Sequence, residues 1–326
     1  MRLAQFTGTT IAAISLALSG VSVQAGILDV VSGAKAAYSL RQLSSSYAGP
    51  ALTVRRASDN ATQAIGFVNG QLDTASLLTF AAGGSVMVTT WHDQTGNGFH
   101  MTRDTTSLQP QVVTSLGNLY LNPVTDLPAI RFTGKSLNCA NGDLWNDELS
   151  VFTAASWITV PTGSDSLAQR LWTIHDGGNT RAAAGGQLSR FGLSYRTTGH
   201  QSATSTTSIT ANEPFVVSYV SDATKPAGQD QLALYLNGDP IWSSSSLTLG
   251  DLAVSNFTIG AHFDSTRAFN GIMHELIVYH DVLSPENRAA VEHALMWYVP
   301  EPGGMMLLLV GGLAVLIGRR RQRQTA

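Results

Sequence analysis

This sequence contains almost no cysteine. Its 326 residues include a single one, Cys139, so no disulfide can form within the chain. A chain of this length can bury a large hydrophobic core, and its stability has to come from that core. Because unpaired cysteine is one of the most frequently buried residue types, we expect Cys139 to be a small buried side chain and not a reactive thiol.

Charged residues are also scarce, at 13% of the chain. Without the two terminal segments, which hold Arg2, Glu301 and four C-terminal arginines, 14 basic and 21 acidic residues remain, a net charge of −7. A body this poor in basic residues is not expected to bind nucleic acid. Serine, threonine, glycine and asparagine are abundant, so we expect partners to be bound through hydroxyl and amide hydrogen bonds.

Several catalytic motifs are missing from the sequence. It has no Gly-x-Ser-x-Gly, His-Glu-x-x-His, P-loop or Gly-x-Gly-x-x-Gly pattern, so serine nucleophiles, zinc proteases and nucleotide chemistry have no support. No cofactor and no metal site are predicted. Calcium stays open as an alternative, since oxygen-rich loops suit it and Asp264 lies in such a loop.

The N-terminus carries the features of a secretory signal peptide. Arg2 supplies a basic start, residues 11–23 form a small-residue apolar run, and an Ala-x-Ala-like site follows, Val23-Gln-Ala25. We therefore predict a signal peptide over residues 1–25 and export of the remainder.

The C-terminus combines three features in a fixed order: the sequence Val299-Pro-Glu-Pro302, an uncharged apolar run over 303–318, and Arg319-Arg320-Arg321. As a helix, the run would span about 24 Å, slightly less than a bilayer core of about 30 Å. The arginines would stay on the cytoplasmic side. The order resembles the PEP-CTERM sorting signal, with Pro300, Glu301 and Pro302 as its motif.

That resemblance implies an exosortase-type protease as a partner and removal of residues 299–326 after export. The alternative is an ordinary membrane anchor, in which residues 303–318 remain in the bilayer. Under either interpretation, the body is periplasmic, held at the cell surface or secreted.

The body, residues 26–298, is expected to form a single all-β domain with short flanking helices. Many short β-branched segments alternate with turns, which is typical of an antiparallel jelly-roll sandwich. Asn237-Gly238 predicts a tight hairpin turn, and Ser284-Pro285 predicts the start of a helix. Residues 198–210 are predicted to be an exposed loop. Helices are expected over 29–43, 74–80 and 284–298, and strands over 52–56, 85–91, 129–132, 151–158, 169–174, 190–196, 214–220, 231–236, 257–261 and 272–280.

Residues 148–298 resemble a concanavalin A-like, laminin-G-type jelly roll through Val151-Phe-Thr-Ala-Ala-Ser-Trp157, Leu234-Tyr-Leu-Asn-Gly238 and Phe269-Asn-Gly-Ile-Met-His-Glu275. Residues 26–147 resemble the catalytic domain of α-L-arabinofuranosidase B through Val54-Arg-Arg-Ala-Ser-Asp59 and Trp91-His-Asp-Gln-Thr-Gly-Asn-Gly98. Both resemblances imply one concanavalin A-like sandwich. The second also implies a retaining glycosidase, which needs two carboxyl groups about 5–5.5 Å apart.

The catalytic residues of that family are matched in part. Asp176-Gly-Gly-Asn179 resembles the family's Asp-Tyr-Gly-Asn segment, but the strand that follows, residues 186–192, has no carboxylate at the place of the nucleophile. His262 occupies the place of the family's acid, with Asp264 two residues later. The candidate catalytic residues are therefore Asp176, Asp264 and Glu275, and the candidate sugar ligands are Asp176, Asn179, His262 and Trp242.

Three functions follow from these observations. The first is an exported, surface-associated protein that binds glycan, including the cell's own exopolysaccharide. The second is an α-L-arabinofuranosidase-type glycoside hydrolase, and the third is a structural envelope protein without ligand. The turn after Trp91 is interpreted as structural, because Asp and Asn stabilise tight turns and Gly96 and Gly98 supply positive φ.

Overall fold

The computed structural model describes residues 26–141, 143, 148–164, 167–176, 178–196, 200–226, 229–244 and 256–299. The predicted signal peptide and the predicted sorting segment, including Pro300, Glu301, Pro302 and Arg319 to Arg321, lie outside the described residues. In the described part of the chain, none of the helices combines the length and the apolar composition that crossing a bilayer requires.

One layer of the sandwich, here the back sheet, has the antiparallel order β18–β17–β16–β11–β20–β1. Its central strands β11 and β20 are buried on both faces along almost their whole length, because the core covers one face and helices cover the other. The strands are β1 (Ala34–Ser39), β11 (Leu149–Trp157), β16 (Pro214–Ser221), β17 (Leu232–Leu236), β18 (Asp239–Ser244) and β20 (Asn270–Tyr279).

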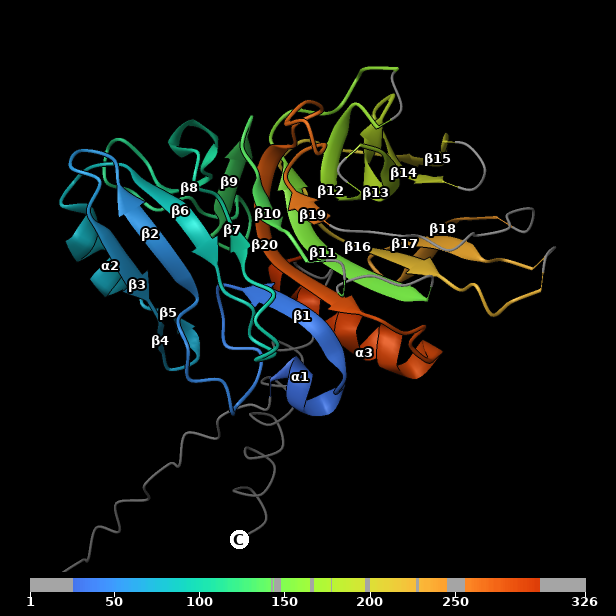
Figure 1. Ribbon diagram of the computed structural model, residues 1–326, viewed down its shortest axis with the longest axis horizontal. Helices are drawn as coiled ribbons and strands as arrows, with labels where there is room; N and C mark the ends of the chain where they lie inside the picture. The colour runs from blue at the N-terminus through green and yellow to red at the C-terminus, as the bar shows by residue number, and fades with distance from the viewer. Residues whose placement is uncertain are drawn as a thin grey trace, which may run out of the picture.

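The second layer, here the front sheet, has the antiparallel order β7–β10–β19–β12–β13–β14–β15. Figure 1 shows β12 to β15 beside one another, away from the helices of the back sheet. The strands are β7 (Met101–Thr102), β10 (Leu137–Cys139), β12 (Gln169–His175), β13 (Thr180–Gln187), β14 (Arg190–Arg196), β15 (His200–Ser208) and β19 (Asn256–Ile259).

Strands from the N-terminal part join the two sheets. β9 pairs with β20 of the back sheet, β6 pairs with β7 of the front sheet, and β8 lies between β6 and β9. The remaining elements are β2 (Leu52–Arg56), β3 (Thr62–Ile65), the small hairpin β4 (Phe67–Val68) and β5 (Gln71–Leu72), α2 (Thr74–Ala81), β6 (Val86–Trp91), η1 (Thr106–Leu108), β8 (Gln111–Val113) and β9 (Ile130–Thr133).

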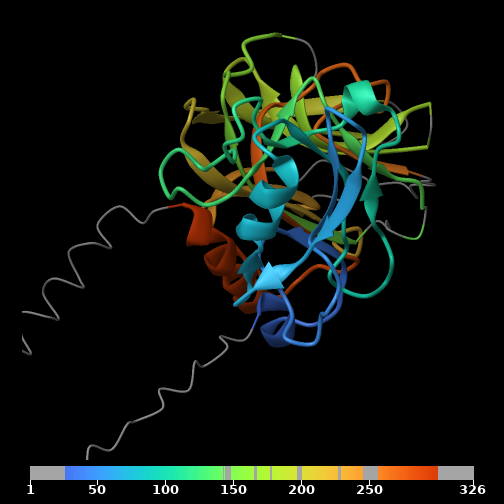
Figure 2. The ribbon, with the colours of Figure 1, turned by 90° about the vertical axis from the view of Figure 1, so that its left-hand side faces the viewer.

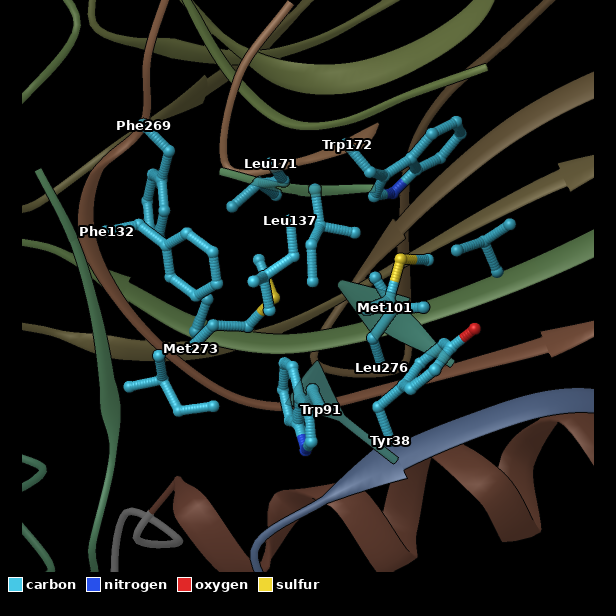
Figure 3. Close-up of a cluster of buried hydrophobic side chains, with 14 of the residues drawn as sticks. Tyr38, Trp91, Met101, Phe132, Leu137, Leu171, Trp172, Phe269, Met273 and Leu276 are labelled. Carbon is cyan, nitrogen blue, oxygen red and sulfur yellow. The ribbon is translucent and has the colours of Figure 1, made fainter. Parts of the chain in front are cut away.

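One large hydrophobic cluster fills the space between the sheets and draws on both parts of the chain. Figure 3 shows Tyr38 and Trp91, from the N-terminal part, packed with Leu137, Trp172 and other side chains of the sandwich. The free Cys139 is 6% exposed within this cluster, and burial raises its pKa to about 11. The prediction of a small buried cysteine is confirmed, and so is the all-β sandwich.

A second cluster lies on the outer face of the back sheet, where α1 (Ile27–Val30) and α3 (Pro285–Leu295) cover it. Figure 2 shows both helices on the side opposite to the front sheet. The predicted start of α3 is confirmed: Ser284 accepts a hydrogen bond from Asn287 N, and Pro285 occupies the first turn. The helix continues into η3 (Met296–Tyr298).

Two predictions about local structure are wrong. The helix expected over residues 29–43 ends at Val30, and β1 follows, because Ala36, Ala37 and Tyr38 are buried on both faces of the back sheet. An apolar run of this kind does not distinguish a helix from a doubly buried strand. The loop expected over 198–210 contains β15, which pairs with β14 at the edge of the front sheet.

The hairpin at Asn237-Gly238 is confirmed. Both residues have positive φ, 51° and 90°, and they connect β17 to β18. These are the backbone angles of the turn that matches the twist of paired strands, and Asn-Gly adopts them at low cost.

Candidate functional site

The face of the front sheet that points away from the core carries a row of small, mostly polar residues, whose central members are buried. Side chains alternate along each strand, so the neighbours Phe257, Trp172 and Ala182 point into the core. The register places one outward residue of each strand beside the next. Across the sheet the row is Thr102, Asn138, Thr258, Thr173, Ala183, Ser194 and Ser202.

Two connections meet at one end of this row: the turn between β12 and β13, and the loop 260–269 that leads from β19 to β20. The loop turns at Gly260, whose φ is 83° and whose Cβ, if present, would lie 2.2 Å from Phe132. Glycine is therefore required there both for its backbone angle and for space. We call the residues brought together the His175–His262 cluster: Arg170, His175, Asp176, Thr180, His262, Phe263 and Asp264.

His262 is held by hydrogen bonds on both ring nitrogens. Nδ1 lies 2.6 Å from Asp264 Oδ1, and Nε2 lies 3.1 Å from Thr180 Oγ1. Arg170 Nη1 donates to the same Thr180 hydroxyl at 2.8 Å. Because the Thr180 hydroxyl oxygen accepts from Arg170, its hydrogen is free to be donated to His262 Nε2. The ring N–H of His262 is then on Nδ1 and donates to Asp264. This arrangement is that of a neutral imidazole.

The electrostatics agree with a neutral His262. Burial lowers its pKa below the ordinary value, and the nearby cations Arg170 and Arg267 lower it further, whereas Asp264 raises it. For Asp264 itself, burial acts to raise the pKa, but the hydrogen bonds from Thr266 and His262 outweigh it and the pKa is lowered. Asp264 is therefore an ionised acceptor within its loop.

His175 lies beside His262 through an aromatic contact. The ring of Phe263 is 5.2 Å from the His175 ring and 3.9 Å from the His262 ring, centroid to centroid. His175 Nε2 also lies 3.1 Å from the Thr258 hydroxyl of the polar row. Burial, with the proximity of His262, lowers the pKa of His175 to about 4, so the ring is neutral at pH 7.

Asp176 and Asn179 form the turn between β12 and β13. Asp176 Oδ1 accepts from Gly178 N at 2.9 Å and from Asn179 N at 2.6 Å, and Oδ2 pairs with Arg181 at 2.5 Å. The hydrogen bond from Gly178, with those from Asn179 and Arg181, lowers the pKa of Asp176 to about 2. Both carboxylate oxygens are engaged in the turn, and Asn179 is exposed beside them.

The cluster contains two of the four predicted sugar ligands, Asp176 and His262, together with the predicted carboxylate Asp264. A third predicted ligand, Asn179, lies beside the cluster in the turn between β12 and β13. Trp242 lies elsewhere: it is on β18 of the back sheet, opposite Leu234, and packs against the core between the sheets.

Glu275 lies on the other side of the molecule. Its carboxylate is fully buried against Arg41 and accepts from Ser39 Oγ at 2.8 Å, next to Tyr298 of η3. It therefore faces the helices that cover the back sheet and not the polar row of the front sheet. The three candidate catalytic carboxylates are thus each committed to local partners, and Glu275 is not positioned to act with the other two.

The turn after Trp91 has the structural role predicted for it. Asp93 is fully buried and accepts from Ala37 N at 3.0 Å, Thr95 N at 3.0 Å and Phe99 N at 3.2 Å. It holds β1 against the turn. In the described ranges, no group of three or more His, Cys, Asp or Glu side chains is arranged to hold a metal ion.

A pocket of about 320 Å³ opens elsewhere, between η3 and the N-terminal strands. Its lining includes Leu40, Leu72, Leu121, Leu127 and Tyr298, and none of the predicted site residues. Because the predicted site residues Asp176, His262 and Asp264 gather at the His175–His262 cluster and not at this pocket, we locate the candidate site at that cluster.

Residues Arg170, Thr180, His175 and Phe263 of the cluster were not predicted. Phe263 directly follows His262, which was selected because it occupies the place of the arabinofuranosidase acid. Its position next to a candidate ligand could therefore have indicated that Phe263 belongs to the site. Arg170 is a charged residue followed by Leu171 and Trp172 in a predicted strand, which is itself unusual. Thr180 carries no signal in the sequence.

Two antiparallel sheets with helices on one outer face define a concanavalin A-like jelly-roll sandwich. Residues 133–287 are similar to the concanavalin A-like lectin/glucanases superfamily, and residues 31–121 to the catalytic domain of α-L-arabinofuranosidase B. The curated proteins contain no match to the chain.

Solved structures agree with this fold. One is a GH54 α-L-arabinofuranosidase soaked with a cyclic sulfate inhibitor, at 14% identity and a TM-score of 0.63. Another is an arabinofuranosidase complexed with arabinofuranosyl-α-1,2-xylobiose, at 16% identity and a TM-score of 0.60. Each comparison covers 83% of this chain and 64% of the other, so this chain spans less than two thirds of those proteins. At such low sequence identity, the structural similarity shows a shared fold and nothing about a shared function.

Proposed function

We propose that this protein binds glycan on the outer face of the front sheet, at the His175–His262 cluster, and does not hydrolyse it. The observation that carries this is the convergence of Asp176, Asn179, His262 and the ring of Phe263, from two connections, at one end of a polar row. Neutral imidazoles, amides and hydroxyls are suitable hydrogen-bond partners for sugar hydroxyls, and an aromatic ring offers a flat apolar surface to a sugar.

Hydrolysis by the arabinofuranosidase mechanism is disfavoured by the state of the carboxylates. A retaining enzyme needs one ionised nucleophile and one acid/base with a raised pKa. The pKa values of Asp176 and Asp264 are both lowered, and Glu275 lies against Arg41 on the far side of the back sheet. The glycosidase alternative therefore ranks below binding.

The protein is proposed to act outside the cytoplasm as one domain over residues 26–298. The support is the signal-peptide pattern of residues 1–25 and the PEP-CTERM-like order of residues 299–326. On this proposal, an exosortase-type protease removes the C-terminal segment, and the exopolysaccharide around the cell is the natural ligand.

The test is binding of the purified protein to an array of neutral and acidic plant and bacterial glycans, followed by calorimetry on the glycans retained. We expect binding that is lost in Phe263→Ala and kept in Trp297→Ala, which removes an aromatic ring that is 57% exposed on η3. A blank array refutes glycan binding. Release of arabinose from a chromogenic arabinofuranoside, abolished in Asp264→Asn, would establish hydrolysis instead.

A further inference from the structure

The guanidinium of Arg170 is buried and largely unpaired. The residue is 1% exposed, and within the described ranges its side chain makes one hydrogen bond, from Nη1 to Thr180. Nε has no hydrogen-bond partner among the described residues. Arg170 also takes part in none of the ion pairs that the described residues form. A guanidinium has five N–H donors, and the bond to Thr180 engages one of them.

A buried, uncompensated charge is costly, and a protein rarely retains one without a reason. Arg41 is an instructive contrast, because its guanidinium forms two hydrogen bonds with Glu275 and a third with Ala294 O. Burial and the neighbouring Arg267 lower the pKa of Arg170 to about 9, so it is still protonated at pH 7. The site therefore presents a cation that forms no direct ion pair among the described residues, with Asp264 as the nearby carboxylate that raises its pKa.

The charges around Arg170 leave an excess of positive charge. Asp176 is neutralised by Arg181, and Asp264 is the remaining carboxylate beside Arg170 and Arg267. With both histidines neutral, the three arginines Arg170, Arg181 and Arg267 exceed the two carboxylates Asp176 and Asp264 by one positive charge, on a body whose net charge is −7. An isolated positive site on an acidic protein selects for an anionic group.

The loop that covers Arg170 is strained. Ser265 and Arg267 both have positive φ, 64° and 48°, although neither is glycine. Such residues cost free energy and are typically kept at binding sites. The contacts that hold this loop to the front sheet include a hydrogen bond from Arg170 N to Arg267 O and one from Thr173 Oγ1 to Ala261 O.

We infer that the glycan taken by this site is acidic, and that the carboxylate of a uronic acid residue docks on the free donors of Arg170 beneath the loop 261–268. This inference rests on the proposed glycan-binding function and specifies its substrate class. The planar fork of a guanidinium matches the two oxygens of a carboxylate, and such charge-assisted pairs are stronger than the neutral hydrogen bonds to sugar hydroxyls.

The test compares each acidic oligosaccharide with its own methyl ester, which keeps the sugar and removes the charge. Calorimetric titrations use oligogalacturonate, oligomannuronate and oligoglucuronate, with the wild-type chain, Arg170→Met and the exposed control Arg190→Met. We expect the wild type to bind at least one free acid about tenfold or more tightly than its ester, the loss expected for one charge-assisted hydrogen bond. Arg170→Met should lose this preference while Arg190→Met keeps it.

Equal affinity of the wild type for acid and ester overturns the inference but leaves glycan binding intact. Binding to neutral glycans alone also overturns the inference and leaves glycan binding intact. If the protein binds no glycan at all, the proposed function itself is refuted. Tighter binding of dextran sulfate than of every uronide overturns the choice of a carboxylate. A thermal melt completes the test: Arg170→Met should melt no lower than wild type, and a clear fall would show that the arginine serves stability instead.

Discussion

Glu275 and Arg41 form a two-pronged ion pair in which Nε donates to Oε2 at 2.9 Å and Nη2 donates to Oε1 at 3.0 Å. The pair joins β20 to Arg41, two residues beyond the end of β1, and Arg41 also donates to Ala294 O near the end of α3. Burial alone would lower the pKa of Arg41, but the Glu275 carboxylate raises it above its ordinary value. The interaction therefore ties the first and last strands of the back sheet to the C-terminal helix.

Breaking this pair should destabilise the fold without affecting the ligand site. Glu275→Gln leaves the Arg41 cation without a counter-ion, and we expect the free energy of unfolding to fall by about 3–5 kcal/mol. Urea unfolding of the purified protein measures it, with the exposed Glu213→Gln as the control. A change below about 1 kcal/mol would mean that water compensates Arg41.

Gly260 should be intolerant of a side chain for two separable reasons. Gly260→Ala imposes a positive φ on alanine and places its Cβ against Phe132 and Lys135 O. Gly70→Ala is the matched control, because Gly70 has a similar φ of 75° but open space around it. We expect a loss of about 1 kcal/mol for Gly70→Ala and at least twice that for Gly260→Ala. Equal losses would show that the loop yields to the methyl group.

Stability should fall as the pH drops from about 6.5 to 4. His274 is fully buried, with Nε2 3.1 Å from Asn122 Nδ2, and burial lowers its pKa to about 4. Below the ordinary pKa of about 6.5, the unfolded chain binds a proton that the folded chain does not, so acid favours unfolding. The stability contributed is complete above pH 6.5 and decreases by up to about 3 kcal/mol by pH 4.

Urea unfolding at pH 4.5 and pH 7.5 measures this difference. His274→Asn should reduce the difference, and the exposed control His293→Gln should leave it unchanged. An unaltered pH dependence in His274→Asn would assign the effect to the other neutral histidines.

Removing the ring of Phe263 should weaken glycan binding more than it weakens the fold. The ring is half-buried and packs on His175 and His262, so Phe263→Ala exposes both imidazoles to solvent. We expect at least a tenfold loss in affinity and a loss of about 1–2 kcal/mol in stability. Phe263→Tyr keeps the ring and should retain binding. If Phe263→Ala binds normally, the sugar does not contact this ring.

Much of the fold follows from local patterns. The strands with clear alternation, the Asn237-Gly238 hairpin and the Ser284 cap were all predictable, because each depends on residues close in sequence. β1 was not, since strands buried on both faces lose the alternation that distinguishes them. β15 was not either, because its Ser and Thr residues are equally common in loops.

The site was predictable in part. Asp176, Asn179, His262 and Asp264 were selected from the sequence, but nothing in it could show that Thr180 and His262, 82 residues apart, share a hydrogen bond. That contact depends on the register of β12, β13 and β19. Glu275 was selected from the sequence but does not belong to the site. A bulge near Met273 decides which face of β20 its side chain occupies, and the sequence does not reveal that bulge.

The pairing of β1 with β20 also determines when folding can finish. Ala37 lies opposite Ile277, so the first strand finds its partner only after nearly all of the chain has been made. Closing a loop of about 240 residues is slow, and among the described strand pairings this one joins the residues farthest apart in the sequence. A nascent chain therefore stays unfolded for most of its synthesis, which is the condition in which a polypeptide can still be threaded through a translocation channel.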